Sequence, residues 1–263
     1  LVHNSYVMQA LSELNIIAVD DKTKTRLELL DEIEHGIVIF TAHGISNKVK
    51  EKAQQKGLIC IDASCPDVVK TQNIVSEYLS KEFDVLYIGK PHHPEAEAVV
   101  SLSEHVHLIS KKEDIENIPY LEKVFVTNQT TMSIFDIQEL FQTIKDRFPH
   151  AVFCEEICNA TRIRQQAVAD LKNKDIDVLY VVGDKYSNNS NRLAQIALDQ
   201  GIKNVYLIDD VTNIQDEQLE NVNRVAVTAG ASTPTYLTTQ VIEYLETYAP
   251  GKPKPAININ KIL

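Results

Sequence analysis

Residues 178–200 read VLYVVGDKYSNNSNRLAQIALDQ, and this stretch shows the unit from which we predict that the fold is built. The run at 178–183 is apolar and rich in valine, which is typical of a buried strand of a parallel sheet. Polar turn residues follow it, and from 191 to 200 the apolar residues recur at a helical period. A strand, a turn and a helix in this order indicate a βα unit.

The same order recurs along the 263-residue chain. We predict further strands at 37–41, 58–62, 85–89, 124–127, 205–209 and 225–228, and helices at 67–81, 134–148, 161–171 and 235–248. This alternation predicts an α/β fold with mainly parallel sheets that are covered by helices. The chain is longer than a usual single domain, and its 44% of hydrophobic residues can form a substantial core, so we expect two or three small domains.

The charge and the apolar pattern exclude several classes of function. A formal charge of −11 argues against a nucleic-acid surface, although a small anion could still bind at helix N-termini. No apolar run approaches the roughly 20 residues that span a bilayer, so we expect no membrane association and a cytoplasmic location. The eight glycines form neither a Walker loop nor a dinucleotide fingerprint. The chain opens at Leu1 rather than Met, and we expect the native N-terminus to lie upstream.

Polar side chains follow nearly all of the predicted strands. In open α/β sheets, ligands bind at the carboxyl ends of the strands. The groups found there are Ala42-His43-Gly44, Ala63-Ser64-Cys65-Pro66, His92-His93-Pro94-Glu95, Asn128-Gln129-Thr130-Thr131, Ser187-Asn188-Asn189-Ser190 and Ala229-Gly230-Ala231-Ser232. A single Ser, Thr or Asn before a helix is more often only an N-cap, so one of these side chains alone does not indicate a binding site, whereas the whole group does.

The four cysteines are too few for a disulfide scaffold, so thiolate ligands or buried thiols are expected. Pro66, Pro94 and Pro234 suit first helical positions, which would make Cys65 an N-cap where the helix dipole favours a thiolate. Cys158 precedes the next helix in a similar setting, whereas Cys60 lies in a strand pattern and looks like core.

Two other groups of potential metal ligands have alternative interpretations. Cys154 and Cys158 could share a helical face and, with a histidine, hold zinc, although their spacing matches no zinc-finger pattern. His105 and His107 are expected to decorate a solvent face.

Taken in order, the motifs resemble those of the LytB/IspH reductases. The matching segments are Leu1-Val2-His3-Asn4, Ala42-His43-Gly44-Ile45, Asp62-Ala63-Ser64-Cys65-Pro66, His93-Pro94-Glu95, Asn128-Gln129-Thr130-Thr131, Ile157-Cys158-Asn159-Ala160-Thr161, Ser187-Asn188-Asn189-Ser190-Asn191-Arg192 and Thr228-Ala229-Gly230-Ala231-Ser232. The resemblance implies three small α/β domains in pseudo-threefold arrangement around a central cavity. Their expected bounds are 1–65, 66–158 and 159–248, followed by a tail at 249–263.

The resemblance also implies the site residues. Cys65 and Cys158 match two of the three cysteines that hold a [4Fe–4S] cluster, and the first is expected upstream of Leu1. Glu95 matches the proton donor, with Thr130 beside it. The residues that match substrate-binding positions are His3, His43, His93, Thr130, Ser187, Asn188, Asn189 and Ser232. Ser64, Asn128 and Asn188 depart from the family pattern, and Asn188 puts an amide where the family has a phosphate-facing hydroxyl.

The implied activity is the reductive dehydroxylation of 4-hydroxy-3-methylbut-2-enyl diphosphate to isopentenyl and dimethylallyl diphosphate, the last step of the non-mevalonate isoprenoid pathway. Three thiolates on a four-iron cluster leave one iron open to the substrate. By the same resemblance, the partners are this small allylic diphosphate and an electron donor such as ferredoxin or flavodoxin. The alternative function is a non-catalytic diphosphate-binding or anion-binding relative that lacks the first cluster cysteine.

Overall fold

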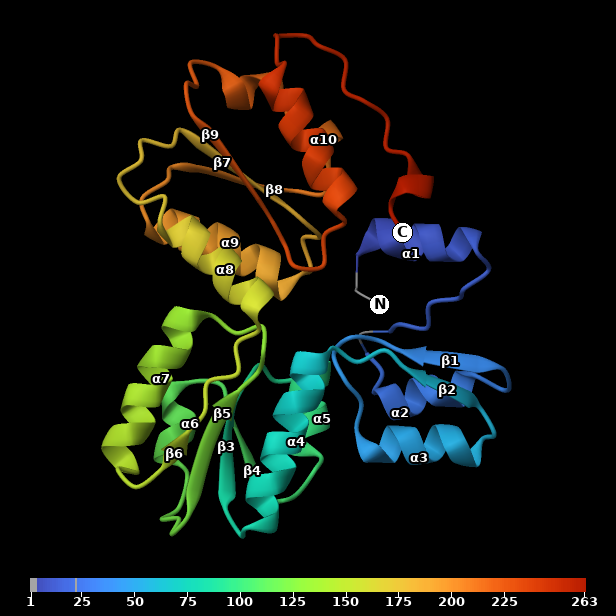
Figure 1. The fold of residues 1–263 in the computed structure, drawn as a ribbon, viewed down its shortest axis with the longest axis vertical. Helices are drawn as coiled ribbons and strands as arrows, with labels where there is room; N and C mark the ends of the chain where they lie inside the picture. Colours follow the sequence, from blue (N-terminus) through green and yellow to red (C-terminus); the bar gives the residue numbers. More distant parts are fainter. Residues whose placement is uncertain (1–3, 22) are drawn as a thin grey trace. The chain divides into compact units, whose positions relative to one another are not determined.

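The computed structural model describes residues 4–21 and 23–263, so His3 lies outside the described residues. Figure 1 shows an α/β fold, and within the described residues every paired strand is parallel to its neighbours. This confirms the predicted fold class. The described chain forms two compact units, one of Val19–Cys158 and one of Asn159–Leu263 with the N-terminal segment through Ala18. The division into three domains and their pseudo-threefold arrangement stay predictions.

The first unit contains two sheets among its described residues, with strand orders β1-β2 and β4-β3-β5-β6. Its strands are β1 (Ile37–Phe40), β2 (Ile59–Asp62), β3 (Asp84–Ile88), β4 (Val106–Ile109), β5 (Val124–Asn128) and β6 (Val152–Phe153). Its helices are α2 (Arg26–Leu29), α3 (Asn47–Gln55), α4 (Pro66–Ser80), α5 (Pro94–Val100), α6 (Lys112–Glu116) and α7 (Ile134–Arg147).

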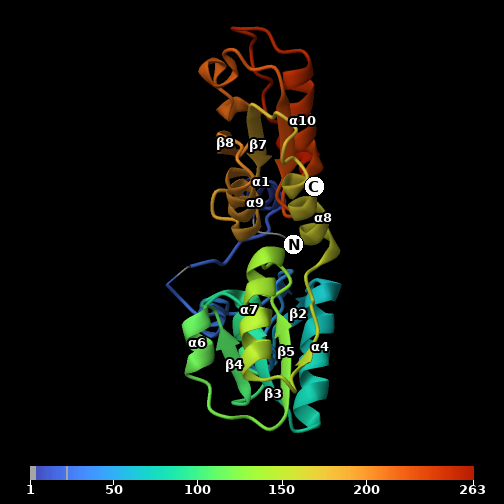
Figure 2. The ribbon, with the colours of Figure 1, turned by 90° about the vertical axis from the view of Figure 1, so that its left-hand side faces the viewer.

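The larger sheet of this unit is covered on both faces. Leu86 and Ile88 of β3 pack with α6 and α7, while Val85 and Tyr87 pack with α4 and α5. This is the two-residue period of a strand, and it explains why these runs are apolar without interruption. In Figure 2, α6 and α4 lie on opposite sides of β3, β4 and β5.

The small sheet β1-β2 is covered on one face. Phe40 and Leu58 pack with Val49 and Ala53 of α3. On the other face the isoleucines remain exposed, with Ile37 and Ile59 each 63% accessible. The core of the first unit therefore centres on the four-stranded sheet.

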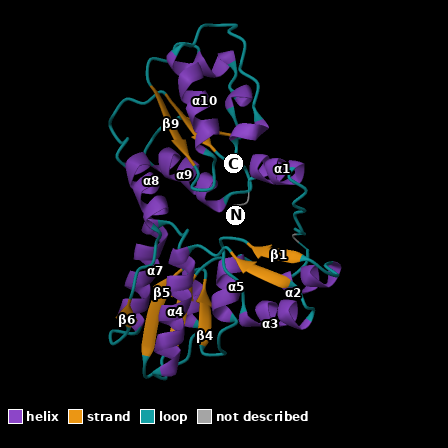
Figure 3. Cartoon of the chain, turned by 45° about the vertical axis from the view of Figure 1, so that its right-hand side comes forward, coloured by secondary structure: helices purple, strands orange, loops and turns teal. Residues whose placement is uncertain are grey.

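The second unit is built around the sheet β8-β7-β9. Its elements are α1 (Ser5–Glu13), α8 (Asn159–Ala169), β7 (Val178–Val182), α9 (Asn188–Asp199), β8 (Asn204–Ile208), β9 (Val225–Ala229) and α10 (Thr235–Glu246). Helices α8 and α9 pack on one face through Leu179 and Val181, and α10 and α1 pack on the other through Tyr180. Figure 3 shows β9 between α10 and α9. The tail returns to α1, where Ile262 joins the same core.

All seven predicted strands are present, each within a residue or so of its predicted bounds. The strands β4 and β6 were not among them, because His107 interrupts the apolar run of β4 and β6 has only two residues. Pro66 and Pro94 occupy first helical positions as predicted, but the prediction for Pro234 is wrong, since it is the N-cap of α10. Among the described residues, no helix combines the length and apolar character required to cross a bilayer.

We predict that the four-stranded sheet carries much of the stability of the first unit. Ile109→Ala, at a fully buried position of β4, should lower the free energy of unfolding by about 2–5 kcal/mol through lost burial and a residual cavity. The control is Ile59→Ala, which truncates the same side chain at an exposed strand position and should change it by less than about 0.5 kcal/mol. Urea unfolding followed by circular dichroism measures both, and equal losses would contradict the prediction.

Candidate functional site

Glu95 is a fully buried carboxyl held at the carboxyl ends of β3 and β5. It lies in the first turn of α5, just after Pro94. The backbone N–H of Thr130 donates to its Oε1 at 2.7 Å, and the Thr130 hydroxyl donates to its Oε2 at 3.1 Å. The Tyr87 hydroxyl adds a longer contact to Oε1 at 3.4 Å. Glu95 and Thr130, which the sequence predicts as partners, are therefore in direct contact.

Burial raises the pKa of Glu95 from 4.5 to about 7, although the hydrogen bonds from Thr130 and Tyr87 act in the opposite direction. Desolvation dominates because a buried carboxylate loses more hydration than a few donors replace. A carboxyl with a pKa near 7 carries its proton in part of the molecules at neutral pH. It can therefore act as a general acid.

His93 and His43 form the neighbouring part of the site. His93 is the N-cap of α5, and its Nδ1 accepts the backbone N–H of Glu95 at 3.2 Å. Burial first, and then His43 and nearby cations, lower the pKa of His93 to about 3, so its ring is neutral with the proton on Nε2. The two rings meet edge to face, with centroids 5.2 Å apart. His93 therefore presents a neutral imidazole rather than a cation.

The turn that carries His43 depends on Gly44. The residue has a φ of +77°, and a Cβ placed there would lie 2.8 Å from Nε2 of Gln72 and 2.9 Å from Val68 of α4. Only glycine fits both the backbone and the space. The Arg26 guanidinium donates to the Gly44 carbonyl at 2.7 Å and holds the turn from the other side.

The cysteines fall into two classes. Cys65 is the N-cap of α4, as predicted, and within the described chain its thiol makes no capping hydrogen bond. Cys158 directly precedes α8, and its backbone N–H donates to the Thr130 carbonyl at 3.0 Å. Cys60 lies in β2 and packs at the edge of the small core, as predicted. All four cysteines are thiols rather than disulfides.

The zinc interpretation is wrong in its premise, since Cys154 and Cys158 do not share a helix. Cys154 follows β6, and α8 begins only after Cys158. Burial, together with the nearby Glu156, raises the pKa of the Cys154 thiol and disfavours its thiolate. In the part of the chain that the structure describes, no group of three or more His, Cys, Asp or Glu side chains could hold a metal ion.

His105 and His107 lie at the opposite end of β3 from Glu95. His105 Nδ1 and His107 Nε2 contact Oδ1 of Asp84 at 3.1 and 3.0 Å. His105 is exposed as predicted, while His107 is half-buried beside Asp84. These histidines pair with a local carboxylate and lie apart from the candidate site.

The second unit has its own polar cluster at the start of α9. Ser187 is the N-cap, and its hydroxyl accepts the Ser190 N–H at 3.3 Å. Asn188 is the first helical residue and Asn189 follows, 93% buried. Among the described residues, neither Oδ1 nor Nδ2 of Asn189 has a hydrogen-bond partner. Buried amides are normally paired, so an unpaired one indicates a position that a ligand can satisfy.

Gly183 and Gly230 leave room for Ser190, so α9 can approach the ends of two strands closely. A Cβ added at Gly183 would lie 2.3 Å from its hydroxyl oxygen, and one added at Gly230 would lie 2.2 Å from it. The two glycines follow β7 and β9, so the helix N-terminus packs directly against both strand ends. Ser232 is half-buried in the turn after Gly230, where Thr233 donates to the Val182 carbonyl at 2.9 Å. The start of α9 and the turn that carries Ser232 are therefore neighbours.

Sequence reasoning missed several supporting residues. These are Tyr87, which the sequence places only in a strand, Arg26, which belongs to no motif, and Ser190, which lies in a motif but has no predicted function there. The two-residue period of a strand places Tyr87 on the same face of β3 as Val85, the face that packs with α5, but no sequence signal indicates the contact of Arg26 with Gly44.

Comparisons with known proteins point to one family. The family model described as LytB protein matches residues 1–246. The chain is 47% identical to the 4-hydroxy-3-methylbut-2-enyl diphosphate reductase of Anoxybacillus flavithermus, over 97% of this chain and 80% of that one. It is 48% identical to the protein of that name from Bacillus cytotoxicus, over 100% of this chain and 85% of that one.

Solved structures agree with the sequence comparisons. The E-1-hydroxy-2-methyl-but-2-enyl-4-diphosphate reductase of Plasmodium falciparum matches with a TM-score of 0.85 and 29% identity, covering 98% of this chain and 83% of that chain. A second structure, an (E)-4-hydroxy-3-methyl-but-2-enyl diphosphate reductase, matches with a TM-score of 0.64 and 27% identity over 94% of this chain and 86% of that one.

We predict that Glu95 makes stability depend on pH. Because its folded-state pKa lies above the ordinary value of 4.5, its contribution to stability is present below pH 4.5 and is lost as the pH rises through about 7. Glu95→Gln cannot ionise, so its stability relative to wild type should rise by about 3 kcal/mol between pH 4.5 and 8. Urea unfolding across this range measures the difference.

The matched control is Glu97→Gln, which neutralises an exposed carboxyl on the same helix and should show a much smaller change. A difference between wild type and Glu95→Gln that stays constant with pH would refute the buried, shifted carboxyl.

Proposed function

The chain belongs to the LytB protein family, and from this premise we propose that it is an iron–sulfur reductase of 4-hydroxy-3-methylbut-2-enyl diphosphate. The products would be isopentenyl and dimethylallyl diphosphate. The buried pair of Glu95 and Thr130 carries the proposal, because it offers a proton beside the turn that bears Cys158, whose N–H donates to the Thr130 carbonyl. The relatives, which are named as reductases, do not favour a non-catalytic anion binder.

For the cofactor we propose a [4Fe–4S] cluster held in part by Cys65 and Cys158. The donor chemistry fits, since both are thiols in turns that directly precede helices, and cysteine sulfur is the usual protein ligand of iron–sulfur clusters. When bound, the cluster would supply the two electrons that break the C–O bond of the substrate. A small electron-transfer protein such as ferredoxin or flavodoxin would deliver those electrons.

Glu95 would hold the proton that the leaving hydroxyl needs. At neutral pH part of the carboxyl is protonated, and the Thr130 hydroxyl in contact with Oε2 offers a route for the proton. A protonated Glu95 also avoids placing a second negative charge beside an anionic substrate. The same burial that raises the pKa of Glu95 therefore serves both proton delivery and binding.

The diphosphate would be bound by imidazole, hydroxyl and amide donors and by helix N-termini. The side chains that we propose as donors, from their match to the family motifs, are His43, His93, Ser187, Asn188, Asn189 and Ser232. The N-terminus of the twelve-residue helix α9 favours an anion through its backbone N–H groups and the helix dipole. His3, outside the described residues, is proposed for the same role, and the cytoplasmic location stays a prediction.

We predict that cluster binding requires Cys65 and Cys158, which precede helices, but does not require Cys60, which lies in a strand. Protein purified without oxygen should show visible absorbance and contain iron and sulfide. Cys65→Ser and Cys158→Ser should each lose most of the iron and all reductase activity, because each removes a thiolate. Cys60→Ser is the matched control and should keep both, since Cys60 lies in β2. Wild-type protein that binds zinc and no iron would overturn the proposal.

We predict that Asn189 binds the diphosphate. Asn189→Ala removes no hydrogen bond from the described structure, so the free energy of unfolding should hold or rise. Affinity for inorganic diphosphate, measured by calorimetry, should fall about tenfold, as expected for the loss of a hydrogen bond to a charged group.

Asn204→Ala is the control, because Asn204 is exposed and its amide donates to the Asp177 carbonyl at the other end of the sheet. It should leave diphosphate affinity unchanged. Lower stability with normal affinity in Asn189→Ala would assign that residue a structural role instead.

A further inference from the structure

The segment that leads to Cys158 is fixed to the end of β5 by alternate residues. The N–H of Cys154 donates to the Val126 carbonyl at 2.9 Å, and that of Cys158 donates to the Thr130 carbonyl at 3.0 Å. Between them, the N–H of Glu156 donates to Oδ1 of Asn128 at 3.0 Å. The segment 154–158 is therefore held alongside β5 by three hydrogen bonds after β6 has ended at Phe153.

The side chain of Glu156 points to α4, although it belongs to a loop 86 residues away in sequence. It is 6% exposed, and both carboxylate oxygens lie 3.0 Å from Nζ of Lys70. The Cys154 thiol donates to Oε1 at 3.3 Å. A carboxylate with so little access to water depends on its partner, because an unpaired buried charge is costly.

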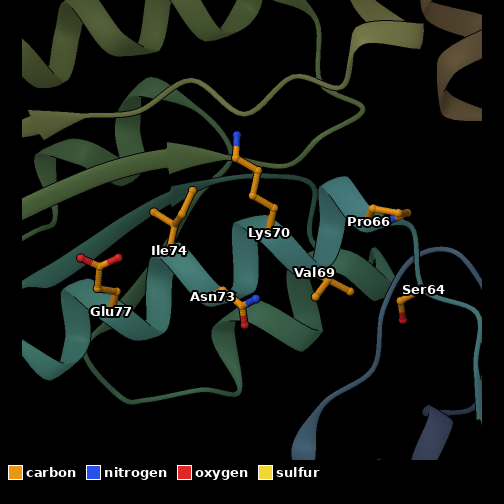
Figure 4. Close-up of a pocket in the computed structure, with 7 residues that line it drawn as sticks. All are labelled: Ser64, Pro66, Val69, Lys70, Asn73, Ile74 and Glu77. Carbon is orange, nitrogen blue, oxygen red and sulfur yellow. The ribbon is translucent and has the colours of Figure 1, made fainter.

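Lys70 lies on the helix that begins at Cys65. It is five residues, less than one and a half turns, from that cysteine. Figure 4 shows Lys70 standing out from α4 beside Pro66 and Val69, at the groove that these side chains line. The ion pair thus joins the helix that starts at Cys65 to the loop that ends at Cys158.

We propose that Lys70 and Glu156 are positioning residues for the two cysteines that would hold the cluster. This inference rests on the proposed function. The pair fixes the loop against α4, so the two thiols keep one separation whether or not a cluster is bound. Without Lys70, the Glu156 carboxylate must reach water, and the loop that carries Cys158 must move to let it.

The test uses the full chain, purified without oxygen and loaded with the cluster. In Lys70→Gln, iron should be released to an anaerobic chelator at least about tenfold faster than in wild type, as is typical for a lost outer partner of a metal site. The electron paramagnetic resonance spectrum of the reduced cluster should also change. Glu156→Gln should behave alike, and the double variant should be no worse than either single one, because both remove the same interaction.

Two variants separate positioning from a general loss of stability. Lys81→Gln removes a similar ion pair, with Glu77 at 2.6 Å, from the exposed far end of the same helix and should leave iron release and spectrum unchanged. Lys70→Arg keeps the charge and should restore near-normal release. Faster release that Lys70→Arg does not reverse, or that Lys81→Gln shares, would overturn the inference.

The outcome also distinguishes the inference from the proposed function. A wild-type chain that binds no cluster would overturn both. A wild-type cluster with an unchanged release rate in Lys70→Gln would overturn only the role of the ion pair.

Discussion

The parallel direction of the strands is the constraint on which the site depends. A chain that must return to start another parallel strand begins its helix at the carboxyl end of the strand just completed. The N-caps of α4, α5, α7 and α9 therefore all lie at strand ends, and they are Cys65, His93, Ser133 and Ser187. The cap and ligand interpretations of such residues do not exclude each other. Ser187 caps α9 through one lone pair and keeps its remaining hydrogen-bonding capacity for a ligand.

Burial then decides the chemistry of these turns. Glu95 and His93 are two residues apart, and desolvation moves the pKa of the carboxyl up and that of the imidazole down. Both shifts favour the uncharged form. The site thus combines a carboxyl that keeps its proton in part of the molecules at neutral pH with an imidazole, that of His93, that can donate a hydrogen bond without carrying charge. This combination suits a reaction that must bind an anion and also protonate a leaving group.

The sequence predicted what is local and missed what is distant. Each long strand was visible because two covered faces make an uninterrupted apolar run, and Cys65 was recognised as a cap because proline follows it. The spacing of Cys154 and Cys158 suggested a helix, but hydrogen bonds to the end of β5 hold that segment extended. The contacts of Glu95 with Tyr87 and of Arg26 with Gly44 depend on packing between elements, which a local pattern does not encode. Glu95 and Thr130 are also distant in sequence, so their pairing was predicted from the family motifs and not from a local pattern.

Thr130 joins the two halves of the proposed chemistry within the first unit. Its N–H and hydroxyl both bind Glu95, while its carbonyl accepts the N–H of Cys158. All of its polar groups are therefore committed, and the residue is almost fully buried. A movement of the loop that carries Cys158 must pull on the Thr130 peptide and so change the hydrogen bonds that oppose the rise in the pKa of Glu95. The position of Cys158, the proposed cluster ligand, and the acidity of Glu95, the proposed proton donor, would thus be coupled through one residue. This coupling gives a physical reason for placing the acid on the same sheet as the cysteine loop.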